Sequence, residues 1–282
     1  MRKKPKKVPQ SLYHYTTTSG LLGILKGKIW ATHINYLNDK KEFIDAMGMF
    51  TTQIKEHNPN ALALIGSERP GWGSIKHLPS DIYYDVVKVL EVLGGMVYVT
   101  AFSEYAMRDQ LSQWRGYCAA GAGFSIGFNL AKFKELAKRV KDKHGTLKKC
   151  IYDPKAKTRQ IEEIIKGAHS EKMRSVSAFS DMIAKMVAIA PYCKDESFRE
   201  ENEWRLAFIE RENALFREGD TLIIPYVEFD LKDDNGRLPI ENIVIGPSPN
   251  MSESYSSLEL LLDQYGIAAN IEESKIPYRP GL

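Results

Sequence analysis

The apolar residues of this chain are divided into short runs, and this division limits the fold more than any other feature. Even long runs, such as Leu21 to Leu25 and Thr221 to Val227, fall far short of the roughly 18 uninterrupted apolar residues that a membrane span requires. With 282 residues, 43% of them hydrophobic, the chain still has enough apolar material for one large domain or two small ones. We therefore expect a globular protein with no membrane partner.

Segments of strand type alternate with segments of helix type. Short apolar or β-branched runs that end at turn residues predict strands over 12–16, 29–36, 96–102, 123–128, 148–152, 203–210, 221–229, 242–246 and 270–276. Apolar residues at helical spacing, with capping residues such as Thr18 and Asn129, predict helices over 19–26, from 37–39 to about 55, and over 81–93, 129–140, 155–190 and 252–265.

No internal repeat, heptad array or linker divides these segments, which favours one domain. We predict an α+β fold over 11–282, with a mixed or antiparallel sheet, preceded by a basic tail over 1–10. The segment 57–80 is rich in Gly, Pro, Ser and Asn and is interpreted as a loop or lid insertion. The segment 155–190, one broken helix or two, is interpreted as a helical insertion.

Charge and cysteine content narrow the class of protein further. The net charge is +3, yet five of the first seven residues are Lys or Arg, so this tail can contact nucleic acid or serve as a solvated terminus. The segment 132–149 is the other basic-rich part. Three widely spaced cysteines (Cys118, Cys150 and Cys193) predict neither a disulfide framework nor a zinc site. The tail is not followed by a signal-peptide core, so we expect a cytoplasmic protein.

Three short motifs carry the candidate functional side chains, and the first is Tyr13-His14-Tyr15-Thr16. On a strand, His14 and Thr16 share one face and the two tyrosines share the other. His14 is either a hydrogen-bonded structural residue or a group that binds a ligand hydroxyl. Thr16 either contacts sugar or phosphate or helps to start the following helix.

The second motif is Ser112 to Tyr117. Trp114 and Tyr117 are three residues apart and share one face of a helical turn, with Arg115 beside them. Either Trp114 anchors the core while Arg115 pairs with a carboxylate, or the group binds a flat, charged ligand such as a dinucleotide. The Gly-x-Gly that follows, at 121–123, lacks the third glycine of a Rossmann fingerprint.

The third motif is Glu203-Trp204-Arg205, preceded by further carboxylates. Glu201 and Glu203 are two apart, so on an extended backbone they project to the same side. One carboxylate can then bind a substrate hydroxyl while the other orients the attacking group. The alternative is a solvated acidic turn in which Glu203 pairs with Arg205 or Arg199.

These motifs together resemble a bacterial family known as a domain of unknown function. The resemblance covers nearly the whole chain and rests on residues 13–16, 19–25, 29–32, 36–39, 103–104, 111–117, 123–128 and 198–205. A histidine in the first strand and a glutamate opening a late strand are also similar to the His-Tyr-Glu type of ADP-ribosyltransferases. That resemblance implies a split sheet and NAD as the substrate.

The second resemblance also implies roles for individual residues. His14 would hold the adenosine ribose or the nicotinamide side of NAD, and Tyr36 or Tyr117 would pack on nicotinamide. Glu203 would bind the nicotinamide ribose, and Glu201 would orient the acceptor. The predicted catalytic residues are thus Glu203 and Glu201, and no metal is implied. The predicted NAD-binding residues are His14, Tyr15, Thr16, Tyr36, Trp114, Arg115 and Tyr117.

The implied activity is transfer of ADP-ribose to a macromolecular acceptor, as in bacterial toxins or phage-defence effectors. The basic tail and the segment 132–149 favour a nucleic acid such as RNA over a protein acceptor. An antitoxin or other regulatory protein is a further expected partner. The alternatives are a non-catalytic nucleotide-binding sensor or interaction module, and an NAD glycohydrolase.

Overall fold

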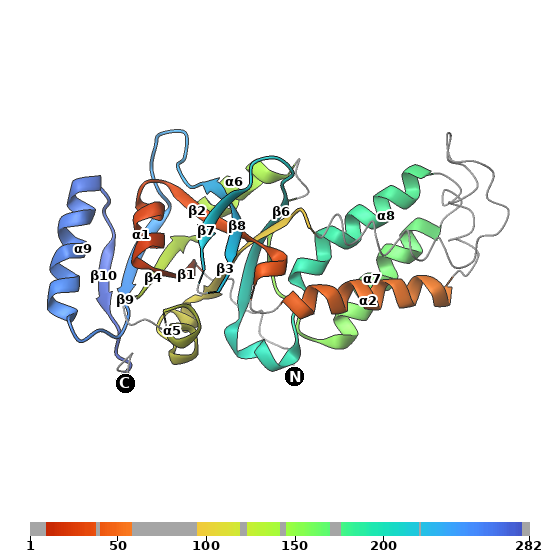
Figure 1. The fold of residues 1–282 in the computed structure, drawn as a ribbon, viewed down its shortest axis with the longest axis horizontal. Coiled ribbons are helices and arrows are strands. Elements are labelled where there is room, and N and C mark those ends of the chain that lie inside the picture. Colours follow the sequence, from red (N-terminus) through yellow and green to blue (C-terminus); the bar gives the residue numbers. More distant parts are fainter. Residues whose placement is uncertain are drawn as a thin grey trace, which may run out of the picture.

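The computed structural model describes residues 10–37, 40–57, 95–118, 123–141, 145–169, 176–219 and 221–277. Within these ranges ten strands form one mixed sheet with helices packed against it (Figure 1), which confirms the α+β prediction. The tail before residue 10, the insertion predicted after His57 and the helix predicted at 81–93 lie outside the described residues.

The strands and helices alternate much as the sequence pattern predicts. The strands are β1 (Ser11–Thr17), β2 (Lys28–His33), β3 (Val97–Glu104), β4 (Gly123–Asn129), β5 (Thr146–Lys149), β6 (Glu203–Ile209), β7 (Leu215–Glu218), β8 (Ile223–Asp230), β9 (Ile240–Ile245) and β10 (Asn270–Glu273). The helices are α1 (Thr18–Leu25), α2 (Lys40–His57), α5 (Leu111–Tyr117), α6 (Leu130–Ala137), α7 (Pro154–His169), α8 (Val176–Ile189) and α9 (Met251–Tyr265).

The sheet branches at β3. One edge of β3 pairs antiparallel with β6, from Ser103 opposite Glu203 to Val97 opposite Ile209. The other edge is shared, because β1 pairs with its carboxyl end and β2 pairs near its amino end. The strand order is β10-β9-β4-β1-β3-β2-β8-β7, and β6 joins β3 to β5. Only β10 and β9 form a parallel pair among these strands.

Side chains close the split where β1 and β2 separate along β3. His14 Nδ1 donates to the carbonyl oxygen of Ala101 at 2.8 Å, and Thr100 Oγ1 donates to the carbonyl oxygen of Trp30 at 3.0 Å. These bonds satisfy polar groups that no neighbouring strand would pair at this point. Both β1 and β2 therefore remain close to the middle of β3.

One face of the sheet is covered by a continuous apolar core. Alternate strand residues such as Leu12, Phe102 and Leu206 point into it, and α1, α6 and α9 contribute further apolar side chains. The predicted cap is present on α6, since Asn129 Oδ1 accepts a hydrogen bond from the Lys132 amide at 3.0 Å. On α1 the cap is Thr17 rather than the predicted Thr18, because Thr17 Oγ1 accepts from the Gly20 amide.

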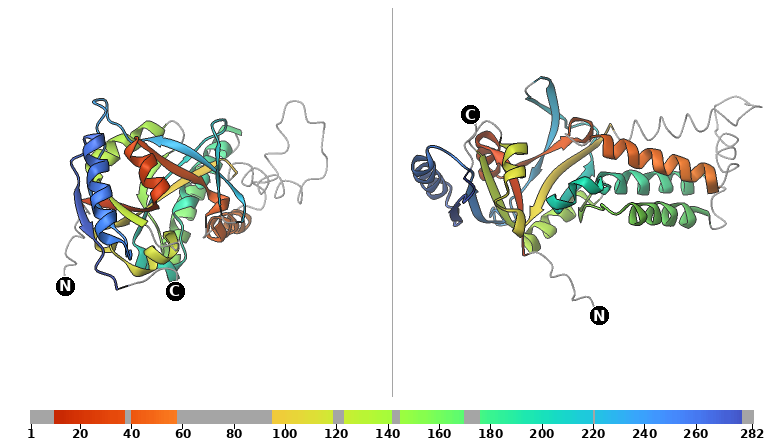
Figure 2. Two further views of the ribbon diagram at one scale, coloured as in Figure 1. Left: turned by 60° about the vertical axis from the view of Figure 1, so that its left-hand side comes forward. Right: turned by 90° about the horizontal axis from the view of Figure 1, so that it is seen from below.

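The opposite face carries two separate apolar clusters. The larger one joins Val97, Val99 and Ala207 of the sheet to α2, α7 and α8. The smaller one consists of Tyr15, Trp114, Cys118 and Val244. In Figure 2, α2, α7 and α8 lie side by side and extend away from the sheet, and we call them the helical arm. Helices α7 and α8 cover most of the segment 155–190, for which the sequence predicts one broken helix or two.

Several predicted boundaries differ from the observed ones. The strand predicted over 29–36 ends at His33, where His33 Nδ1 accepts from the Asn35 amide and a 3₁₀ turn over Ile34–Tyr36 begins. The strand predicted over 270–276 ends at Glu273. The four-residue strand β7 was not predicted, because it is short and carries two charged residues.

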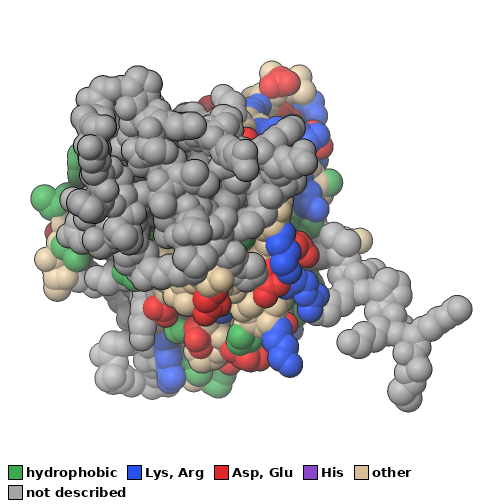
Figure 3. Space-filling model, turned by 90° about the vertical axis from the view of Figure 1, so that its right-hand side faces the viewer, with side chains coloured by type: hydrophobic (Ala, Val, Ile, Leu, Met, Phe, Trp, Pro, Cys, Tyr) green, Lys and Arg blue, Asp and Glu red, His purple; other side chains and the backbone are tan. Residues whose placement is uncertain are grey.

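The face of the molecule seen from the side of the helical arm mixes both signs of charge. Figure 3 shows Lys and Arg side chains interspersed with Asp and Glu around the part that is not described. None of the described helices is both long enough and apolar enough to cross a membrane.

Candidate functional site

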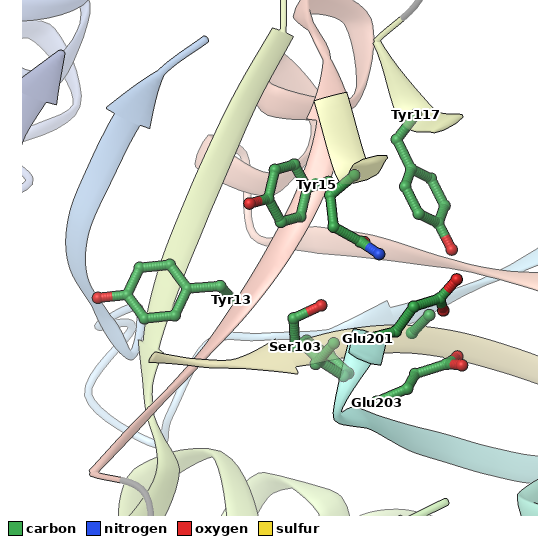
Figure 4. A pocket seen from close by; sticks show the side chains of 9 residues that line it. Tyr13, Tyr15, Ser103, Tyr117, Glu201 and Glu203 are labelled. Atoms are coloured by element: carbon green, nitrogen blue, oxygen red, sulfur yellow. The ribbon is translucent and has the colours of Figure 1, made fainter. Parts of the chain in front are cut away.

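A small hollow opens beside the smaller apolar cluster, next to the start of β6 (Figure 4). It is lined by Tyr13, Tyr15, Ala101, Phe102, Ser103, Gln113, Tyr117, Glu201 and Glu203. Its volume is about 10 Å³, which is room for about one water molecule. A larger ligand would therefore have to extend over the rim, where Tyr117 is 42% exposed.

A row of three residues crosses three neighbouring strands at the hollow. Tyr13 of β1 lies opposite Ser103 of β3, and Ser103 lies opposite Glu203 of β6. Directly opposed strand residues project from the same face of a sheet. The register of the sheet thus brings a phenol ring, a hydroxyl and a carboxylate together on the face that carries the hollow.

Glu203 belongs to a buried cluster of charges, which we call the ion cluster (Lys194, Glu201, Glu203 and Arg205). Arg205 Nε donates to Glu203 Oε1 at 2.7 Å, and Arg205 Nη2 donates to Oε2 at 3.2 Å. Lys194 Nζ also contacts Glu203 Oε2. The predicted Glu203–Arg205 pair is therefore present, but it is buried rather than solvated.

Lys194 is the functional candidate that the sequence reasoning missed. It follows the 3₁₀ turn Ala190–Tyr192, is 3% exposed and contacts both Glu201 and Glu203. The distance from Lys194 Nζ to Glu201 Oε2 is 2.6 Å. The sequence signal, visible in hindsight, is one lysine directly after the apolar residues 190–193.

The backbone between the two glutamates is not extended, in contrast to the geometry from which we predicted their common direction. Glu201 ends a 3₁₀ helix over Glu196–Glu201, and Asn202 has a left-handed conformation with φ of 44°. Asn accepts this conformation more readily than most residues. Both glutamates still line the hollow, because the turn at Asn202 and the shared lysine direct them there.

The tyrosine rings on the other side of the hollow are held by α5. Tyr15 and Tyr117 are stacked at 6.5 Å between ring centroids, and Trp114 meets Tyr15 edge-on at 4.6 Å. Trp114 Nε1 donates to Asp109 Oδ1 at 2.8 Å, which fixes the indole. Tyr15 Oη donates to the Met107 carbonyl, and burial raises the pKa of Tyr15. In Figure 4 the Tyr117 hydroxyl points toward the carboxylates.

The remaining predicted residues lie elsewhere. His14 lies on the opposite face of β1 from the tyrosines, packed against Phe102, and burial lowers its pKa. Thr16 lies against Gly20, where an added Cβ would be 1.9 Å from Thr16 Oγ1. Tyr36 packs on His33 near the other end of β3, and Arg115 is exposed on α5. Of the predicted set, Tyr15, Tyr117, Glu201 and Glu203 line the hollow, and Trp114 supports it.

Comparison with known proteins gives a partial match to one family model and no function. Residues 113–206 match the model of a family described as a protein of unknown function, DUF2971. This span begins in α5 and ends in β6, so it includes Gln113, Tyr117, Glu201 and Glu203 of the hollow. The match supports the resemblance to a family of unknown function over less than half of the chain. No curated protein and no solved structure matches.

The part of the chain that the structure describes has no group of three or more His, Cys, Asp or Glu side chains arranged to hold a metal ion. The three cysteines are buried and form no disulfide. Burial raises the pKa of Cys118 to about 12. The groups that could bind or react with a ligand are thus the hydroxyls, the ion cluster and the tyrosine rings around the hollow.

Proposed function

We propose that the protein cleaves NAD at the nicotinamide glycosidic bond and transfers ADP-ribose to a macromolecular acceptor. The observation that carries the proposal is the placement of the Glu201 and Glu203 carboxylates opposite the Tyr117 ring across one hollow. An aromatic ring suits a flat nicotinamide, and carboxylates suit the hydroxyls of its ribose. The weaker resemblance to ADP-ribosyltransferases supports the same reaction.

The chemistry requires negative charge beside the ribose. Loss of nicotinamide develops an oxocarbenium cation, which a fixed carboxylate stabilises. The contacts of Glu203 with Arg205 and Lys194 occupy three of its roughly four acceptor positions. The remaining position on Oε1 would accept a ribose hydroxyl. Glu201, whose side chain is 20% exposed, would orient the acceptor group at the rim.

The basic part of the surface supports a nucleic acid, such as RNA, as the acceptor. The carbonyl oxygen of Gln10 accepts from the Leu130 amide at 2.9 Å, so Gln10 lies beside the start of α6. Lys132, Lys134 and Lys138 are exposed on or next to this helix. Positive charge on neighbouring segments favours binding to phosphates. A role as a cytoplasmic toxin or phage-defence effector, with a regulatory protein such as an antitoxin, follows from the proposed reaction by analogy.

One observation favours a second candidate, a module that binds NAD or another nucleotide without turnover. Arg205 and Lys194 both contact Glu203, so protein cations already balance its charge. A carboxylate that is neutralised in this way stabilises a developing cation less than an unpaired one. The two candidates differ in whether NAD is consumed.

Labelled NAD distinguishes the candidates. The full chain is incubated with alkyne-tagged NAD and separate RNA, DNA and protein fractions, beside the Glu203→Gln variant and the control Glu162→Gln. Glu162 pairs with Lys166 on α7 and does not line the hollow. We expect label on the RNA fraction with the wild type and the control, and none with Glu203→Gln. Nicotinamide release without label would indicate a hydrolase, and NAD binding without consumption would indicate the binding module.

A further inference from the structure

We propose that Arg217 binds the diphosphate of a nucleotide on a surface that is separate from the hollow. We call this surface the arginine shelf, and it consists of Trp30, Thr32, Arg217 and Tyr226. The proposal goes beyond the proposed function and does not depend on it. Binding of a nucleoside diphosphate can be tested without any turnover.

Among the described residues, Arg217 has no carboxylate partner of the kind that a half-buried arginine ordinarily has. Its Nη2 donates to Thr32 Oγ1 at 3.3 Å, and its guanidinium carbon lies 5.7 Å from the centroid of the Trp30 ring. Its Nε is buried and has no hydrogen-bond partner within the described part of the chain. No carboxylate in the described ranges forms an ion pair with it. By contrast, Arg108 pairs with Glu272 and Arg205 pairs with Glu203.

A guanidinium without a counter-ion is costly to bury, because it loses water and gains no opposite charge. The cost is visible here as a lowered pKa of Arg217, which is caused by burial. The planar guanidinium offers several donors in a fixed geometry that matches a phosphate. An anionic oxygen beside the guanidinium would supply the missing charge.

The neighbouring rings fix the direction of Arg217. Trp30 and Tyr226 pack at 5.0 Å between centroids, and both are half-buried. Thr32 lies opposite Tyr226 in the pairing of β2 with β8. The shelf is therefore built on three hydrogen-bonded strands, β2, β8 and β7, which hold its side chains more rigidly than loops would.

The shelf and the hollow share one face of the sheet. Thr32 lies opposite Val99 of β3, so its side chain is on the same face as those of Ala101 and Ser103, which line the hollow. The carbonyl oxygen of Trp30 is 3.0 Å from Thr100 Oγ1, the neighbour of Ala101. Val99, which lies between them, is buried against the helical arm, so the shelf and the hollow are separate surfaces.

The shelf is too far from Glu203 for one dinucleotide to use both. The path from Glu203 crosses to Ser103, runs four residues along β3 to Val99 and crosses to Thr32. Strand spacing and rise make this path on the order of 20 Å. The diphosphate of NAD is bonded to the nicotinamide ribose, so it stays close to a ribose that is bound at Glu203. The shelf is therefore a separate site for a nucleoside diphosphate.

Calorimetric titration of the full chain with ADP, inorganic pyrophosphate and adenosine tests the shelf. The variants are Arg217→Gln, which removes the charge, and Arg217→Lys, which keeps the charge and loses the planar donors. The control is Arg139→Gln, since Arg139 is exposed and pairs with Asp234. Melting temperatures establish that each variant is folded.

We expect ADP to bind more tightly than adenosine, and Arg217→Gln to weaken ADP binding about tenfold or more. Arg217→Lys should lie in between, and Arg139→Gln should bind ADP as the wild type does. Equal binding of ADP and adenosine would overturn the proposal, as would equal losses in Arg217→Gln and Arg139→Gln. Arg217-dependent ADP binding without NAD turnover would retain the shelf and reject the proposed reaction. NAD turnover together with ADP binding that does not depend on Arg217 would reject the shelf and retain the proposed reaction.

Discussion

Lys194 and Glu203 form an ion pair in which each side chain is only 4% exposed. The same ammonium group lies 2.6 Å from Glu201 Oε2, so one lysine joins both carboxylates of the hollow. Arg205 approaches Glu203 from β6 at 2.7 Å. Because the side chains of Lys194, Glu203 and Arg205 are almost fully buried, their charges are balanced by each other rather than by water.

Replacing Lys194 by methionine should destabilise the fold strongly. The variant leaves two carboxylates near each other with one cation fewer, and breaking a buried pair in this way costs about 3–5 kcal/mol. Lys166→Met is the matched control, since Lys166 pairs with Glu162 at the surface of α7 and should lose less than about 1 kcal/mol. Urea unfolding measures both losses. Equal small losses in the two variants would contradict the buried ion cluster.

His14 should make the stability depend on pH. Burial lowers its pKa in the folded protein below the usual 6.5, so below about pH 6.5 the unfolded chain takes up a proton that the folded chain does not. The free energy of unfolding should therefore fall with decreasing pH, by at most about 1.4 kcal/mol per pH unit from this group. Urea unfolding of His14→Asn at about pH 7.5 and about 5.5 should show a smaller decrease than in the wild type. An unchanged decrease would place the pH dependence in other groups.

The aromatic ring of Tyr117 should contribute to NAD binding. The side chain is 42% exposed, so Tyr117→Ala should change the free energy of unfolding by less than about 1 kcal/mol. If nicotinamide packs on this ring, the alanine variant should raise the KM for NAD about tenfold, which corresponds to about 1.4 kcal/mol. Tyr117→Phe keeps the ring and should retain a KM close to that of the wild type. Similar KM values for alanine and phenylalanine would argue against stacking.

The sequence pattern predicts local structure well where one element determines it. On α2, the predicted inward residues Phe43, Met47, Phe50 and Ile54 are all buried, because helical spacing alone selects that face. Asn129 caps α6 as predicted, since its side chain bonds within its own turn. In both cases the interaction lies within a few residues of sequence.

The candidate site depends on contacts that sequence spacing does not encode. The branch at β3 arises from strand pairs far apart in the chain, so the row Tyr13, Ser103 and Glu203 could not be predicted from any one motif. Lys194 and Arg217 lie outside the three motifs, and they become candidates through their neighbours in space. For His14 the sequence left two alternatives, a ligand-binding group or a hydrogen-bonded structural residue. Its hydrogen bond to the Ala101 carbonyl corresponds to the structural alternative.

The central claim is that the carboxylates at the hollow act on NAD, and release of nicotinamide measures this most directly. The wild type, Glu203→Gln, Glu201→Gln and the control Glu162→Gln are incubated with NAD, and free nicotinamide is quantified by chromatography. We predict release by the wild type and the control, and a rate at least about 100-fold lower for Glu203→Gln, with NAD binding retained. Release that is equal in Glu203→Gln and the control, or absent from the wild type with every acceptor supplied, would contradict the account.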